Sequence, residues 1–78
     1  METELYQRLV SLVASYIGED KAKRAVSRQV QKANATPQTL TASDLRSILE
    51  YLIGATTLYL HPDKGRQDQL AASIKALL

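Results

Sequence analysis

The chain contains no cysteine and only one histidine, His61. The lack of cysteine excludes disulfide bonds, thiolate zinc sites and thiol catalysis, and one histidine cannot build a histidine-rich metal site. Tryptophan and phenylalanine are also missing, so four tyrosines are the only aromatic residues. Small domains commonly compensate for a small core with disulfides, a metal or self-association. Self-association is therefore the default expectation for this chain.

Signatures of catalysis and of membrane targeting are also lacking. There is no glycine-rich phosphate loop and no pair of carboxylates at a spacing that suggests acid–base work. We therefore expect no enzyme activity, no cofactor and no metal site. Residues 1–4 lack the positive charge and apolar core of a signal peptide, and the apolar run 48–60 is too short to span about 30 Å of hydrocarbon. The sequence predicts a cytoplasmic protein that does not bind membranes.

Apolar residues at helical spacing are present along most of the chain. They recur at i, i+3 and i+4, and glycine, asparagine and proline residues separate the stretches. No stretch alternates polar and apolar residues as a strand would. The predicted helices cover about residues 3–17, 19–33, 43–60 and 66–78. Because 78 residues leave room for one small domain, we predict a single all-α domain, a bundle of four helices over residues 1–78.

The third predicted helix, residues 43–60, is apolar over an unusually large part of its circumference. Leu49 and Leu52 lie on its main apolar stripe, and we expect both to be deeply buried. Tyr51 and Leu58 project to one side of that stripe. Such a helix is either the central helix of the bundle or part of a second interface. A two-fold contact between two copies would cover the Tyr51 and Leu58 side, so we predict a homodimer with these two residues at its interface.

Positive charge is concentrated in one segment, although the net charge is only +2. Residues 21–32 carry five basic residues and no acidic one. At helical spacing, four of them form a row about 16 Å long: Lys21, Arg24, Arg28 and Lys32. This row is a solvated helix face, a surface for an acidic protein partner, or a track for nucleic-acid phosphates. No aromatic residue is interleaved with the basic residues in the sequence, which favours a protein partner over nucleic acid.

The residues His61-Pro62-Asp63, followed by Lys64, stand between the third and fourth predicted helices. They resemble the signature loop of J-domain co-chaperones, and the resemblance implies stimulation of a partner chaperone's ATPase. The chain departs from that family before the loop, where residues 47–60 contain no lysine or arginine, whereas the family's helix is strongly basic. In the alternative interpretation, Pro62 ends one helix and Asp63 begins the next.

The sequence thus predicts a small protein-binding adaptor or regulatory protein that acts as a homodimer through its third helix. The alternative is a small nucleic-acid-associated protein that uses the basic residues of the second helix, and a third hypothesis is a J-domain-like co-chaperone. The salt dependence of binding separates the first two hypotheses. Four phosphate contacts predict that a plot of log affinity against log salt concentration has a slope of about −3 to −4.

Overall fold

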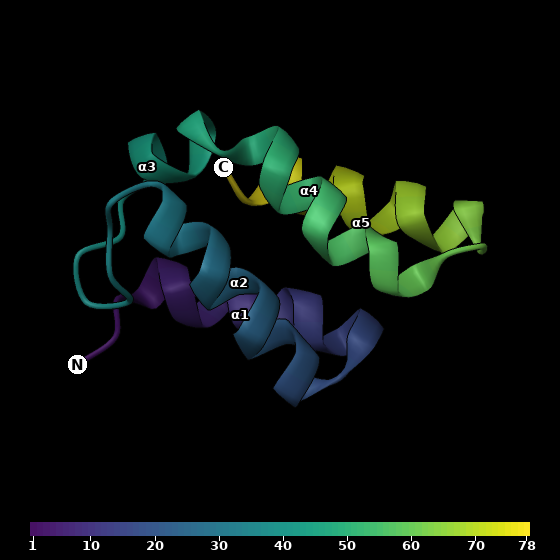
Figure 1. Ribbon diagram of the computed structural model, residues 1–78, viewed down its shortest axis with the longest axis horizontal. Helices are drawn as coiled ribbons and strands as arrows, with labels where there is room; N and C mark the ends of the chain where they lie inside the picture. Colours follow the sequence, from purple (N-terminus) through teal and green to yellow (C-terminus); the bar gives the residue numbers. More distant parts are fainter.

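The computed structural model describes all 78 residues, and its only secondary structure is helical (Figure 1). The elements in chain order are α1 (Glu4–Ile17), α2 (Glu19–Lys32), α3 (Ala42–Ser47), α4 (Leu49–Thr57), the 3₁₀ helix η1 (Leu58–Leu60) and α5 (Lys64–Leu77). The predicted all-α bundle is therefore confirmed.

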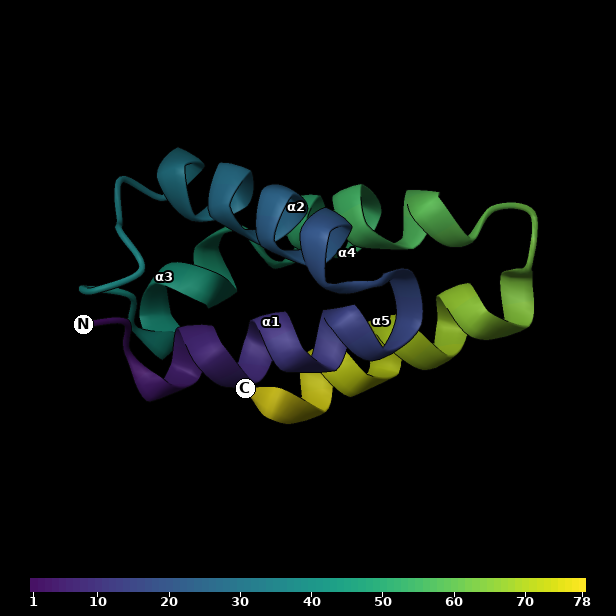
Figure 2. The ribbon, with the colours of Figure 1, turned by 90° about the horizontal axis from the view of Figure 1, so that it is seen from below.

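The four longer helices form an antiparallel bundle of two layers. Each of these helices packs against two others: α1 and α4 both contact α2 and α5. In Figure 2, α2 and α4 make up one layer, α1 and α5 make up the other, and α3 covers one end. Because successive long helices run in opposite directions, the start of α2 lies beside the end of α4, and the end of α2 lies beside the start of α4.

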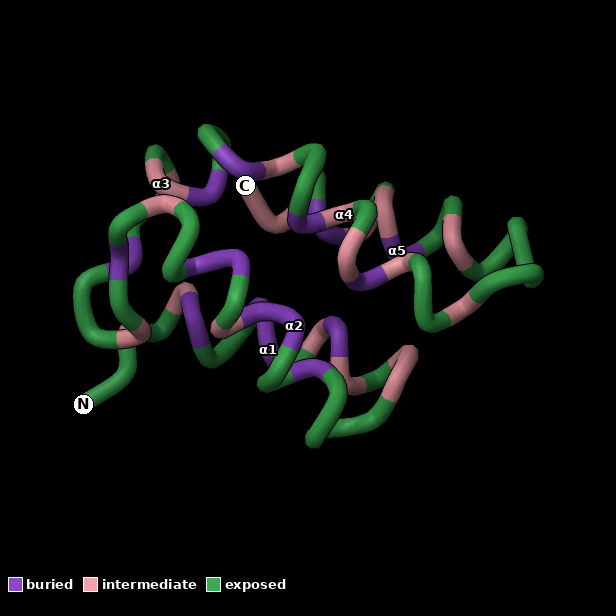
Figure 3. The backbone as a smooth tube through the Cα atoms, in the orientation of Figure 1, coloured by how far each residue is buried: buried purple, intermediate pink, exposed green.

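One apolar cluster fills the space between the layers, and every long helix contributes to it. Its fully buried members include Leu9 of α1, Val26 of α2, Leu52 of α4 and Ile74 of α5. Figure 3 shows that the buried stretches of these helices alternate with exposed ones, as amphipathic helices require. The expected deep burial is present for Leu52 but not for Leu49, which is only partly buried.

Side-chain caps fix where several helices begin. The Thr3 hydroxyl accepts a hydrogen bond from the backbone N–H of Tyr6 at 3.2 Å, which caps α1 as a threonine at this position should. The Asp63 carboxylate accepts from the backbone N–H of Arg66 at 3.1 Å and caps α5. With this cap in place, α5 begins at residue 64 rather than at the predicted residue 66.

The helix predicted over residues 43–60 is not continuous, which corrects the sequence-based prediction. Ile48 leaves the helical conformation, with φ −119° and ψ 12°, and its backbone N–H donates to the carbonyl of Leu45 at 3.2 Å. The Ser47 hydroxyl also donates to the carbonyl of Asp44, at 2.6 Å, and such bonds compete with a regular helix. The break turns both Leu45 and Ile48 into the core, so apolar burial offsets the interrupted backbone bonding.

The end of α4 also departs from a regular helix. The hydroxyl of Thr56 donates to the carbonyl of Leu52 at 2.9 Å, and that of Thr57 donates to the carbonyl of Ile53 at 2.7 Å. Hydroxyls that bond back in this way tend to bend a helix, and the chain tightens into η1 directly afterwards. The 3₁₀ turn carries Leu58 and Tyr59, both of which are exposed.

Candidate functional site

The basic residues predicted to form a row on α2 do so, and all of them face solvent. The basic row consists of Lys21, Arg24, Arg28 and Lys32. The ion pairs of the chain join other residues, Arg8 to Glu4 and Lys23 to Glu19. No carboxylate therefore lies within ion-pair distance of any cation in the basic row.

Lys23, the remaining basic residue of α2, forms an ion pair within its own helix. Its ammonium lies 3.2 Å from the carboxylate of Glu19, one helical turn earlier. This hydrogen bond, together with the negative charge of Glu19, raises the pKa of Lys23 above its ordinary value. The charge of Lys23 is thus already matched within α2, whereas the charges of the basic row are not.

Two lysines of the basic row lie near exposed tyrosines of the neighbouring α4–η1 segment. The Nζ atom of Lys21 lies 5.8 Å from the ring centroid of Tyr59, and that of Lys32 lies 6.0 Å from the ring centroid of Tyr51. Both distances fall within the range of cation–π contacts, about 6 Å. No aromatic residue is interleaved with the basic residues in the sequence, but Tyr51 of α4 and Tyr59 of η1 lie beside them in space.

A groove of about 250 Å³ lies between α2 and the α4–η1 segment. Alanines of both helices and Leu58 provide its apolar part, and cations of the basic row provide its rim. We call it the α2–α4 groove; its lining residues are Arg24, Ala25, Arg28, Gln29, Lys32, Ala55, Leu58 and Tyr59.

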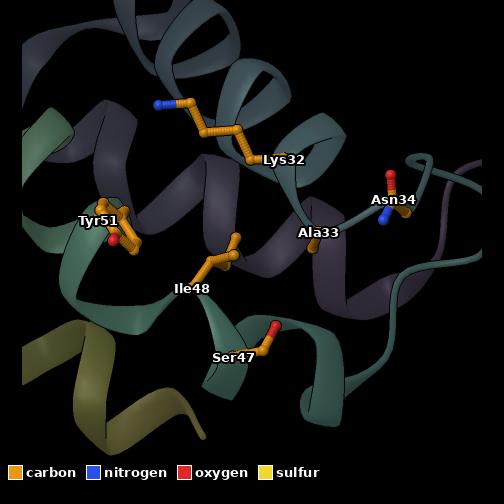
Figure 4. A pocket seen from close by; sticks show the side chains of 6 residues that line it. All are labelled: Lys32, Ala33, Asn34, Ser47, Ile48 and Tyr51. Atoms are coloured by element: carbon orange, nitrogen blue, oxygen red, sulfur yellow. The ribbon is translucent and has the colours of Figure 1, made fainter.

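A second depression, of about 370 Å³, adjoins this groove at Lys32, which lines both. It lies where the chain breaks between α3 and α4, and Ile48 and Tyr51 contribute its apolar part (Figure 4). In Figure 4 the Lys32 side chain extends from α2 toward the part of α4 that carries Tyr51. The helix break missed by the sequence analysis therefore shapes this end of the surface.

Gln29 is a residue of the α2–α4 groove that the sequence analysis did not single out. Its side chain is 4% exposed, and the side-chain oxygen is buried with no hydrogen-bond donor. An unsatisfied buried polar atom costs about 1–3 kcal/mol, so the side-chain oxygen of Gln29 lowers the stability of the fold. Its position could have signalled burial, because it follows the buried Ala25 and Val26 by four and three residues.

The two predicted interface residues, Tyr51 and Leu58, are 68% and 70% exposed. They are not covered within the chain, which contradicts the alternative that the third predicted helix is simply the central helix of the bundle. Both residues adjoin the basic row, Tyr51 through Lys32 and Leu58 through the α2–α4 groove. The basic row and these two side chains therefore form one surface. We call it the α2–α4 face; it consists of Lys21, Arg24, Arg28, Lys32, Tyr51 and Leu58.

The residues His61, Pro62 and Asp63 are exposed in the connection between η1 and α5. Asp63 serves as the cap of α5, as the alternative interpretation of this segment expects. None of the three residues lines the depressions of the α2–α4 face. The tripeptide thus lies outside both depressions of the α2–α4 face.

No three histidine or acidic side chains gather closely enough to hold a metal ion. None of the helices has the length and apolar character that crossing a bilayer requires. The chain matches no known protein family, no curated protein and no solved structure.

Proposed function

We propose that this protein is a small adaptor or regulatory protein that binds an acidic segment of another protein on its α2–α4 face. One observation carries the proposal: three cations without carboxylate partners, Arg24, Arg28 and Lys32, line a groove whose other wall presents exposed apolar side chains. Buried apolar contact supplies much of the affinity at protein interfaces, and complementary charge orients the partners and speeds their encounter.

The apolar part of the α2–α4 face supports a protein partner over a nucleic acid. The tyrosines beside the basic row do not distinguish the two partners, because single-stranded nucleic acids also stack on exposed aromatic rings next to cations. The apolar part of the groove includes the exposed side chain of Leu58. Such a surface binds aliphatic or aromatic side chains and offers no favourable contact to phosphates. Nucleic-acid binding through the basic row is thus the less favoured hypothesis.

Affinity capture from the native host tests the proposal. The wild type would be compared with Arg24→Glu/Arg28→Glu and with Lys64→Glu/Lys75→Glu, which changes the net charge equally but lies on α5. A protein retained by the wild type and the α5 variant, lost from the α2 variant, and released by salt is the expected result. Capture that is abolished by nuclease would contradict a protein partner. Equal capture by all three proteins would mean that the basic row is an ordinary solvated helix face with no role in binding.

Homodimerisation through Tyr51 and Leu58 is the second candidate function, favoured by the exposure of these two side chains. It uses the same α2–α4 face, so a second copy and an acidic partner would compete for it. A two-fold contact at this face brings the two basic rows toward each other. Self-association should therefore strengthen with added salt, whereas binding of an acidic partner should weaken.

A further inference from the structure

Gly54 lies inside α4 at a position where the fold does not require glycine. Only Gly18 has a positive φ, 91°, among the glycines, and a Cβ atom added at Gly54 would meet no atom within 4 Å outside its own stretch of helix backbone. Glycine in a helix interior destabilises the helix relative to alanine. The chain thus keeps an exposed, bare stretch of helix backbone at a cost in stability that no internal contact explains.

The bare backbone at Gly54 is flanked by the two most exposed apolar side chains of α4 and η1. Gly54 follows Tyr51 by three residues and precedes Leu58 by four, so the three share one side of the helix. Ala55, beside it, lines the α2–α4 groove. A small residue between two larger ones lets another backbone approach closely while the larger side chains pack on either side of it.

The walls of the groove also limit the backbone conformation of its occupant. Both walls are helices, whose backbone N–H and C=O groups are already bonded within each helix. An extended peptide would find no backbone partners here, in contrast to one that joins the edge of a sheet. A helix satisfies its own backbone groups and needs only side-chain contacts.

We infer that the partner segment is a single amphipathic helix that packs over Gly54 and Ala55, with its acidic residues along the flank next to α2. This inference rests on the function proposed above and specifies its ligand. The basic row extends over about three helical turns, so the bound helix has at least about 12 residues.

The test uses a designed peptide of about 18 residues, long enough to form a helix. Its leucines recur at i, i+3, i+4 and i+7, and glutamates occupy both flanks; a control peptide has the same composition in an order that spreads the leucines over all sides. Titration calorimetry measures binding to the intact protein. We expect micromolar affinity for the amphipathic peptide, none for the control peptide, and loss of binding in Arg24→Glu/Arg28→Glu.

Substitution of Gly54 provides the sharper test. Gly54→Ala and Gly54→Gln should raise Tm, because both residues favour helix more than glycine does, yet Gly54→Gln should weaken peptide binding at least about tenfold, which is about 1.4 kcal/mol. Gly54→Ala should weaken it less. The matched control is Gly65→Ala in α5, where a Cβ atom meets only the Asp63 side chain at 3.6 Å. It should leave peptide affinity unchanged.

The outcomes separate failure of this inference from failure of the proposed function. Unchanged affinity in Gly54→Gln, with binding still lost in the α2 variant, would overturn the packing over α4 and leave an acidic partner on α2. Equal binding of the two peptides would overturn the helical conformation of the ligand. Failure of the amphipathic peptide to bind would overturn the inference alone if capture from the host still depended on Arg24 and Arg28.

Discussion

The Lys32 ammonium lies 6.0 Å from the ring centroid of Tyr51, and this contact joins the basic row of α2 to the exposed side of α4. The Tyr51 side chain is 68% exposed, and a cation–π contact at such a site contributes only about 0.5–1 kcal/mol. The pair therefore adds little to the stability of the fold. It does bring a cation and an aromatic ring to the same place on the surface, next to the depression at the α3–α4 break.

Removal of the Tyr51 ring tests whether this part of the α2–α4 face contacts the bound peptide. Tyr51→Ala should lower the free energy of unfolding by no more than about 1 kcal/mol, because the ring is mostly exposed. The affinity for the amphipathic acidic peptide should fall about tenfold or more, as for an aromatic residue at the core of an interface. Tyr51→Phe keeps the ring and should bind normally. An equal loss in both variants would assign the effect to the hydroxyl rather than to the ring.

Two leucines of α4 provide a test of the core. Leu52 is fully buried, so Leu52→Ala should lower the free energy of unfolding by about 2–4 kcal/mol. Leu49 is only partly buried, and Leu49→Ala should cost about half as much. Urea denaturation of both variants measures the difference. Equal losses at low protein concentration would contradict the partial exposure of Leu49 in this fold.

Replacement of Gln29 should separate stability from binding. Gln29→Met keeps the length of the side chain and removes the unsatisfied oxygen, so the free energy of unfolding should rise by about 1 kcal/mol. Peptide affinity should stay unchanged, because the buried oxygen offers no accessible surface to a peptide in the α2–α4 groove. Gln31→Met, at an exposed position of the same helix, is the control and should change both quantities little. A loss of stability in Gln29→Met would mean that the oxygen is hydrogen-bonded in solution.

The helical architecture follows from local patterns in the sequence. Apolar spacing sets which side of each helix is buried, and this is why the basic row of α2 and the exposure of Tyr51 and Leu58 agree with expectation. The break at Ile48 does not follow from local patterns, since the apolar spacing continues through it. It depends on the long-range burial of Leu45 and Ile48, which no single helix encodes.

The composition of the α2–α4 face was likewise not predictable from one helix at a time. Periodicity orients Lys21 on α2 and Tyr59 after α4, but it does not determine that the start of one helix lies beside the end of the other. Gln29 is a different case, because its spacing from Ala25 and Val26 places it on the buried side of α2, although glutamine is mostly exposed in proteins. The packing of α4 against α2 then leaves its oxygen buried without a donor.

Salt dependence distinguishes the two occupants proposed for the α2–α4 face. Between about 0.01 M and about 1 M salt, the Debye length falls from about 30 Å to about 3 Å. Repulsion between the basic rows of two copies is then screened, so sedimentation velocity should show a dimer fraction that rises with salt. Over the same range, the affinity for the acidic peptide should fall. Leu58→Glu should remain monomeric throughout, because it places a charge in the two-fold contact; a dimer that persists in this variant, or that dissociates as salt is added, would have to form through another surface.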